Sequence, residues 1–175
     1  MVETRVIGVY HNIQHPDYKK VMDYFRAKIQ PEERVTVESP WDLDKILFEG
    51  KNHHAPQYRF LHNLCILLNE VGAQAIPVED MRIYRIRARL RTWYMFDGTE
   101  DLEKDWKYQK TSVIASIRLL ELAQEEGSST LICGILHAYD LQKIGHPNVV
   151  MLSEIPLEVR EKEDTWIEKY GKSLL

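Results

Sequence analysis

The sequence contains few cysteines, and they form no recognisable motif. Cys65 and Cys133 both lie inside apolar segments and make neither a CxxC pair nor a disulfide-like spacing. Isolated cysteines of this kind suit a protein of a reducing compartment, where disulfides are rare. Cys133 lies inside an expected strand, and we expect its thiol to be chemically inert.

Long hydrophobic runs are also missing. The first residues, Met-Val-Glu-Thr-Arg-Val, contain no apolar signal-peptide core. No apolar run approaches the ~20 residues that a membrane-spanning helix needs. The sequence therefore predicts a cytoplasmic protein without a membrane partner.

The chain lacks an excess of positive charge and a glycine-rich phosphate loop. Its formal net charge is −4. The whole chain therefore gives no reason to expect a nucleic-acid partner, and it contains no nucleic-acid-binding motif. The missing loop argues against a nucleotide-binding fold of the dinucleotide or P-loop kind.

The chain does contain an alternation of strand-like and helix-like segments. With 175 residues and 44% hydrophobic content, it can form a single α/β domain covering 1–175. The expected strands are 5–10, 34–37, 73–78, 130–136 and 149–152. The expected helices include 58–71, a helical insertion at about 81–126 and a C-terminal helix at about 157–170. This order predicts a three-layer fold, with a mostly parallel central sheet of about five strands and helices on both faces.

One short pattern occurs twice, as Gly8-Val-Tyr-His11 and Gly134-Ile-Leu-His137, each time at the end of an apolar run. A glycine at these positions lets backbone or substrate approach closely, because it has no Cβ. All five expected strands end in a group that can transfer a proton or bind a metal: His11, Glu38, Glu79-Asp80, His137 and Glu154. Since the carboxyl ends of parallel strands share one edge, the pattern predicts a functional site there.

These residue types allow two kinds of chemistry. Two histidines with one or two carboxylates suit a divalent ion such as Zn²⁺, Mn²⁺ or Co²⁺, which lowers the pKa of bound water for hydrolysis. Without a metal, a histidine can act as a general base, and a carboxylate can orient its other nitrogen. The alternative is that His11 and His137 are hydrogen-bonded residues that close the ends of their strands.

Three stretches carry a resemblance to a known superfamily: Val6-Ile-Gly-Val-Tyr-His11-Asn, Val35-Thr-Val-Glu38 and Leu131-Ile-Cys-Gly-Ile-Leu-His137-Ala. In order and spacing they resemble the superfamily that groups the TraB/PrgY proteins, the TIKI metalloproteases, erythromycin esterase and the ChaN haem-binding proteins. The resemblance implies an α/β domain with its site at the strand ends. It also implies metal-dependent hydrolysis, with His11, Glu38 and His137 as the residues carried over. Val9 and Tyr10 stand where the esterase-like members have an acidic residue, and some members bind without catalysis.

The strongest basic cluster follows the third expected strand and consists of Arg82, Arg85, Arg87, Arg89 and Arg91. Its alternation from Arg85 onward allows an edge strand, but helical apolar spacing and a cap at Asp80 favour a helix. The cluster begins just past Glu79-Asp80, so the first turn of the helix, with Arg82 and Arg85, can face the site and bind an anionic group such as phosphate or carboxylate. The alternative is a solvated helix paired with the acidic stretch 100–105.

Two further groups are open to interpretation. His53 and His54, on the connection after the second strand, either overhang the same edge or form an exposed pair without a role. The four tryptophans are expected to pack in the core or at the subunit interface of a homo-oligomer; they are Trp41, Trp93, Trp106 and Trp166.

Two functions of different classes therefore remain open. The first is a metal-dependent hydrolase of a peptide or small-molecule substrate, in which His11, Glu38 and His137 are metal ligands and catalytic residues and Glu79 or Asp80 assists. The second is a non-catalytic or regulatory protein that binds a small anionic molecule at the same edge. Nucleic-acid binding through the arginine-rich helix is a third hypothesis. The first accounts for more of the strand ends.

Overall fold

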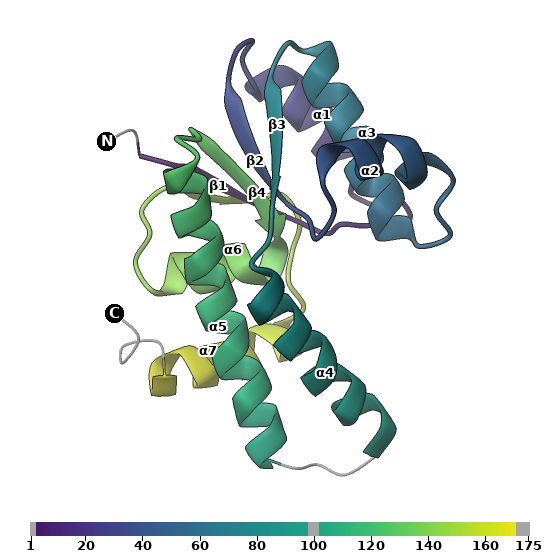
Figure 1. Cartoon of the computed structure of the whole chain (residues 1–175). Helices are drawn as coiled ribbons and strands as arrows, with labels where there is room; N and C mark the ends of the chain where they lie inside the picture. Colours follow the sequence, from purple (N-terminus) through teal and green to yellow (C-terminus); the bar gives the residue numbers. More distant parts are fainter. Residues whose placement is uncertain (1–2, 98–101, 171–175) are drawn as a thin grey trace.

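A computed structural model describes residues 3–97 and 102–170, without the side chains of residues 91–106, 108, 109, 169 and 170. Strands and helices alternate through this part of the chain (Figure 1). The strands are β1 (Arg5–Val9), β2 (Arg34–Glu38), β3 (Gln74–Val78), β4 (Thr130–Gly134) and β5 (Val149–Met151). The helices are α1 (Tyr18–Lys28), α2 (Leu43–Glu49), the 3-10 helix η1 (Gly50–Asn52), α3 (Pro56–Glu70), α4 (Met81–Asp97), α5 (Leu102–Glu125), α6 (Ile135–Lys143) and α7 (Leu157–Tyr170).

The five strands form one sheet in the order β3-β2-β4-β1-β5, and every neighbouring pair is parallel. In the centre, Ile7 of β1 lies between Ile132 of β4 and Val150 of β5. The crossovers through helices that parallel pairing requires explain why strands and helices alternate along the chain. The predicted parallel sheet of about five strands is confirmed.

Successive residues of the central strands face opposite layers of helices. Ile7 and Ile132 belong to a core that also contains Phe25 of α1 and Leu64 of α3. Their neighbours Val6 and Leu131 belong to a second core with residues of α5 and α6. Figure 1 shows α1, α2 and α3 on one side of the sheet and α5 and α6 on the other. The predicted three-layer arrangement is therefore confirmed.

The direction of the crossovers reverses in the middle of the sheet. After β1 and β2 the chain moves toward the edge strand β3, through α1 and then α3. After β4 it moves the other way, through α6 and past β1, to β5. The connections that leave β1 and β2, the two neighbours of β4, therefore run in one direction, and the connection that leaves β4 runs in the opposite one. Such a reversal opens a crevice beyond the carboxyl ends of the strands, where ligands bind in α/β proteins.

The expected fourth strand, 130–136, is wrong at its end. β4 stops at Gly134 and α6 starts at Ile135, so His137 lies in the first turn of a helix. The apolar run through Leu136 hides this change, because apolar residues in sequence do not distinguish a buried strand from a buried helix start. His11 likewise follows the last residue of its strand, because β1 ends at Val9.

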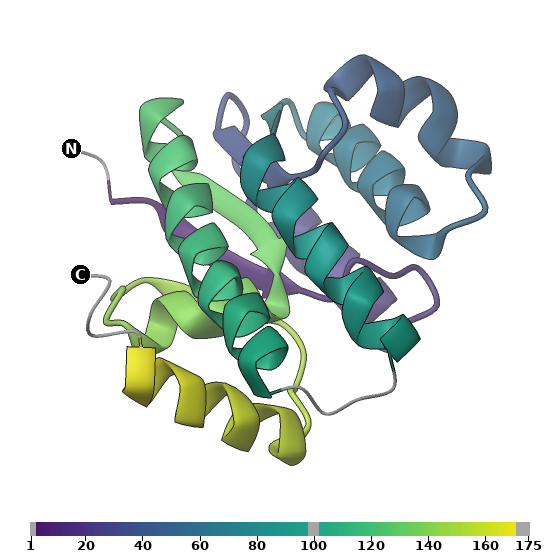
Figure 2. The ribbon, with the colours of Figure 1, turned by 60° about the horizontal axis from the view of Figure 1, so that its bottom comes forward.

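The basic segment is helical, as the sequence favoured. The Asp80 carboxylate accepts hydrogen bonds from the backbone N–H groups of Arg82 and Ile83, at 2.9 and 3.1 Å, and so caps the start of α4. Figure 2 shows α4 and α5 side by side, on the path from β3 to β4. The single-domain organisation with an insertion at 81–126 remains a prediction. Within residues 3–97 and 102–170, no helix has both the length and the apolar character needed to cross a membrane.

Candidate functional site

His11, Glu38 and His137 come together at the carboxyl edge of the sheet. His11 follows β1, Glu38 is the last residue of β2, and His137 lies in the first turn of α6, just after β4. These are the three strands at which the crossover direction reverses. The carboxylate of Glu38 interacts electrostatically with both imidazoles. The topology thus gathers at one place three side chains that are distant in sequence.

His11 is half-buried, and one side of its imidazole packs against the protein. Its ring stacks on Phe60 of α3, with the ring centroids 5.4 Å apart. Burial lowers the pKa of His11 below its ordinary value, although the nearby Glu38 carboxylate opposes this shift. The ring is therefore neutral at neutral pH. Its Nε2 atom is buried and has no hydrogen-bond partner, a condition that costs roughly 1–3 kcal/mol unless a ligand satisfies the atom.

Glu38 is held from two directions. Its Oε2 accepts a hydrogen bond from the Gly134 N–H at 2.6 Å, and its Oε1 lies 3.5 Å from His137 Nε2. Burial by itself raises the pKa of Glu38, but His137, His11 and the Gly134 amide outweigh burial and hold the pKa well below its usual range. The carboxylate is therefore ionised at neutral pH. A Cβ at Gly134 would lie 3.4 Å from Glu38 Oε2, so this glycine allows the close approach.

His137 has a partner on each ring nitrogen. Arg87 Nη1 lies 3.0 Å from Nε2, and Ser116 Oγ lies 2.7 Å from Nδ1. The single hydrogen of the Ser116 hydroxyl goes to Asp140, so Nδ1 carries a hydrogen, and Nε2 lies between the Arg87 guanidinium and the Glu38 carboxylate. Nδ1–H donates to Ser116 Oγ, whose hydroxyl donates to Asp140 Oδ2 at 2.7 Å. This chain of hydrogen bonds fixes the tautomer and the orientation of the ring.

Sequence patterns do not reveal Ser116 and Asp140 as part of the site. Asp140 follows His137 by three residues, which places both on one face of a helix. This three-residue spacing is informative only if the strand ends at Gly134 and His137 already belongs to a helix. Ser116 lies within the long helix α5, and nothing in its spacing distinguishes it from other polar residues.

The arginine that reaches the site is Arg87, two residues beyond Arg85, and not Arg82 or Arg85, which the sequence favoured. Arg82 and Arg85 are exposed, whereas Arg87 is half-buried and contacts His137. Arg91, whose side chain lies outside the described part, belongs to the same cluster. The proposed pairing of this helix with the acidic stretch 100–105 falls on residues that are likewise not described.

Glu79 and Asp80 follow β3 but have different surroundings. Burial and the Glu38 carboxylate raise the pKa of Glu79 to about 7, against the opposing effect of His137 and Arg87. Glu79 therefore shares the edge with the central group. Asp80 caps α4 through its Oδ1 atom, and its Oδ2 atom lies 3.7 Å from the Nε of Arg118. Both oxygens of this carboxylate therefore already have partners.

His137 is surrounded by acidic groups and a single described guanidinium. Burial also raises the pKa of Asp140, while His137 and Arg87 oppose that shift. Arg87 thus favours the charged form of both Glu79 and Asp140, and its guanidinium offsets their negative charge. The Nε atom of Arg87 is buried and has no hydrogen-bond partner. The guanidinium is a cation placed among acidic groups with its hydrogen bonding incomplete.

The donors at this edge suit a divalent ion in type, although they are not gathered around one point. Among the described residues, no three His, Cys, Asp or Glu side chains have an arrangement that would hold a metal ion. The buried Nε2 of His11 is unpartnered, Glu38 is ionised, and a cation already lies against His137 Nε2. A divalent ion binds to neutral imidazoles and ionised carboxylates, in surroundings that tolerate positive charge.

The loop histidines pack with aromatic residues. The His53 ring lies edge-on to Trp41, with centroids 5.1 Å apart, and stacks on His54 at 4.4 Å. His54 itself is exposed. Trp93 and Trp106, which the sequence assigned to the core or an interface, have side chains outside the described part.

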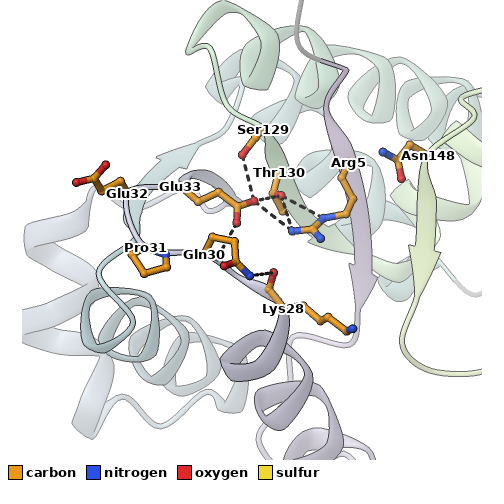
Figure 3. Close-up of a pocket in the computed structure, with 9 residues that line it drawn as sticks. All are labelled: Arg5, Lys28, Gln30, Pro31, Glu32, Glu33, Ser129, Thr130 and Asn148. Atoms are coloured by element: carbon orange, nitrogen blue, oxygen red, sulfur yellow. Dashed lines mark hydrogen bonds and ion pairs between the residues drawn. The ribbon is translucent and has the colours of Figure 1, made fainter.

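A hollow of about 520 Å³ lies at the opposite, amino-terminal edge of the sheet (Figure 3). Its centre is the Glu33 carboxylate, which accepts hydrogen bonds from Arg5, Ser129 and Thr130. These bonds join the starts of β1, β2 and β4. Because the central charge is already paired, this network explains how the strand starts are held together and is separate from the histidine edge.

Comparisons of the chain with protein-family models, with curated proteins and with solved structures found no match. The resemblance to the TraB-like superfamily therefore stays an expectation from the sequence motifs. The geometry at the carboxyl edge is the basis for inferring a function.

Proposed function

We propose that this chain is a metal-dependent hydrolase of the peptidase or esterase type, centred on His11, Glu38 and His137. The observation that carries the proposal is the buried, unpartnered Nε2 of His11 beside the ionised Glu38, at the edge where His137 is also held in place. Two imidazoles and a carboxylate are typical ligands of catalytic Zn²⁺, and Mn²⁺ or Co²⁺ accept the same donors. When bound, such an ion lowers the pKa of water and supplies a nucleophile at neutral pH.

The protein's own groups have separate roles in this proposal. His11 offers a neutral nitrogen, because burial lowers its pKa, and Glu38 offers a negative charge. Ser116 and Asp140 hold the His137 ring in one orientation. Glu79, with a pKa raised to about 7, still carries a proton in part of its population at neutral pH and can give it to a leaving group.

The test is hydrolysis of a panel of dipeptides and aryl esters by protein supplied with Zn²⁺, Mn²⁺ or Co²⁺. We expect metal-stimulated turnover that falls at least about a hundredfold in His11→Ala and in Glu38→Gln. His54→Ala, which changes an exposed histidine, should retain the activity. Equal activity in the parent and His11→Ala, or no metal-stimulated turnover on any substrate, contradicts the proposal.

A second candidate function, binding of a small anionic ligand without catalysis, is favoured by one observation. The buried Nε–H of Arg87 has no acceptor, and a carboxylate or phosphate would provide one. This version predicts that inorganic phosphate raises the melting temperature and that the effect is lost in Arg87→Met. Loss in Arg82→Ala or Arg85→Ala would instead support the first-turn arginines that the sequence suggested.

A further inference from the structure

The exposed face of α4 carries a row of arginines. Arg82, Arg85 and Arg89 follow one another at spacings of three and four residues, which places them on one face of the helix. All three are exposed, and their guanidinium groups make no hydrogen bond or ion pair within the described part of the chain. Ile86, which is 50% exposed, lies on the same face. These four residues form the α4 stripe. No acidic residue occurs from 81 to 90, so the helix itself does not offset this positive charge.

A row of the opposite charge lies on α7. Spacings of three and seven residues place Glu158, Glu161 and Glu168 on one face of this helix. All three are exposed, and among the described residues their carboxylates have neither a hydrogen-bond donor nor a cation as partner. Leu157, which is 70% exposed, precedes Glu161 by four residues and lies on the same face. These four residues form the α7 stripe.

The two stripes match in charge and in spacing. Arg82 and Arg89 are seven residues apart, and so are Glu161 and Glu168, which corresponds to about 10 Å along each helix. Each stripe also contains one exposed aliphatic side chain, whose burial would favour association. A contact between two α4 stripes, or between two α7 stripes, would place like charges opposite one another. The α4 stripe therefore complements the α7 stripe and not a copy of itself.

The two stripes do not meet within one chain. Figure 2 shows α5 between α4 and α7, and α5 packs against both helices. The other cations of α7, Arg160 and Lys162, flank its stripe, and Arg160 donates a hydrogen bond to the Ile155 carbonyl at 2.8 Å. Both stripes therefore remain open to a second molecule.

We propose that the α4 stripe of one copy of this chain docks on the α7 stripe of a second copy. A nucleic acid fits the α4 stripe less well, because the formal net charge of −4 and the α7 stripe both repel a polyanion. Each copy has one stripe of each sign, so a twofold dimer pairs both stripes of both copies. The inference goes beyond the proposed hydrolase and does not depend on it.

A contact of one helix with another covers a small area, and its charged groups lie near water. The association is therefore weak and sensitive to salt, with a dissociation constant on the order of 100 µM at low ionic strength. Salt above physiological concentration should abolish it, because exposed charges are then screened within a few ångströms.

Sedimentation velocity of the full-length protein tests the inference, at about 10 to about 500 µM protein in low and in high salt. In low salt the mass of the parent should rise with concentration, and in high salt it should stay that of a monomer. Arg82→Glu with Arg89→Glu should weaken the association at least tenfold, and so should Glu161→Arg with Glu168→Arg. An equal mixture of these two double variants should associate again, because each one supplies the charge that the other now needs.

Arg59→Glu is the control, because Arg59 is exposed on α3, away from both stripes, and this variant should associate like the parent. A parent that stays monomeric in low salt overturns the inference, and this result needs no variant. Unchanged association in either double variant, or a mixture that stays monomeric, also overturns it. A monomeric parent that binds a single-stranded oligonucleotide through Arg82 and Arg89 would assign the α4 stripe to a polyanion instead. All these measurements read mass or binding, so they are independent of whether the protein hydrolyses any substrate.

Discussion

At the scale of single residues, the orientation of His137 depends on Ser116, which is not itself one of the proposed metal ligands. Ser116 joins His137 Nδ1 to Asp140 through one hydroxyl, with both contacts at 2.7 Å. The same hydroxyl lies 3.0 Å from the Ser112 carbonyl, but a carboxylate is the stronger acceptor at the shorter distance. The ring is thereby fixed with Nε2 directed toward Glu38 and Arg87.

Replacing Ser116 by alanine should therefore weaken both the fold and the site. The buried Nδ1–H would lose its acceptor, at a cost of roughly 1–3 kcal/mol in the free energy of unfolding. Metal affinity should fall about tenfold to a hundredfold, as is usual when a group that orients a ligand is removed. Urea unfolding and Zn²⁺ titration measure these two effects.

Ser112→Ala is the matched control for that variant. Ser112 is also buried on α5, and its contact with Ser116 uses the backbone carbonyl, which the substitution leaves in place. Equal losses of metal affinity in the two serine variants would show that the Ser116 hydroxyl has no specific role.

Glu79 should make the metal-free protein less stable as the pH rises. Its pKa is about 7 in the folded protein and 4.5 ordinarily, so between these values the folded state holds a proton that the unfolded state has lost. The free energy of unfolding therefore decreases as the pH rises from about 4.5 to about 7. The total decrease is on the order of 3 kcal/mol. Glu79→Gln removes this contribution.

The measurement is urea unfolding of the parent and Glu79→Gln across pH 4 to 8, with a chelator present. The stability of the variant relative to the parent should increase from about pH 4.5 to about pH 7 and then level off. Glu168→Gln, at an exposed position of α7, should show no such trend. A pH-independent difference for Glu79→Gln contradicts the raised pKa.

At the scale of secondary-structure elements, Gly8 determines how α6 lies on the sheet. A Cβ at Gly8 would come within 2.4 Å of the Ala138 Cβ and 3.3 Å of the Ile135 Cα, both in α6. Neither atom is the end of a flexible side chain, so the helix itself would have to move. The glycine of the first GxxH motif thus makes room for the helix that carries the histidine of the second.

Gly8→Ala should accordingly destabilise the protein by about 1–3 kcal/mol, the usual cost of overpacking a core. The double variant with Ala138→Gly relieves the closest contact. It should be more stable than the sum of the two single effects predicts, by at least about 0.5 kcal/mol. Urea unfolding of the four proteins measures this coupling, and strictly additive effects would mean that α6 is not positioned by Gly8.

Sequence patterns predict the elements well where one signal dominates. The arginine-rich segment is helical because Asp80 caps it, and both features are visible in the sequence. The end of β4 cannot be predicted from the sequence, because Ile135 and Leu136 continue the apolar run of the strand. In the structure these two residues are helical, and α6 packs closely against Gly8. Tertiary contact between distant segments decided that boundary.

At the scale of the whole molecule, the fold explains why the site lies where it does. Alternation of strands and helices predicts a parallel sheet, and a parallel sheet puts all carboxyl ends at one edge. The strand order, with β4 between β1 and β2, is set by long-range packing that no local pattern encodes. This order brings His11, Glu38 and His137 together. The same long-range packing adds Ser116 and Arg87 from α5 and α4, so the sequence alone could not identify them.

The most direct test of the proposed metal centre is equilibrium dialysis of the protein against Zn²⁺, Mn²⁺ and Co²⁺, followed by elemental analysis. The parent is compared with His11→Ala, His137→Ala and, as a control, His54→Ala. The account predicts close to one ion per chain in the parent and in His54→Ala, and none in the other two. A parent that binds no ion, or an unchanged stoichiometry in His11→Ala and His137→Ala, would contradict it.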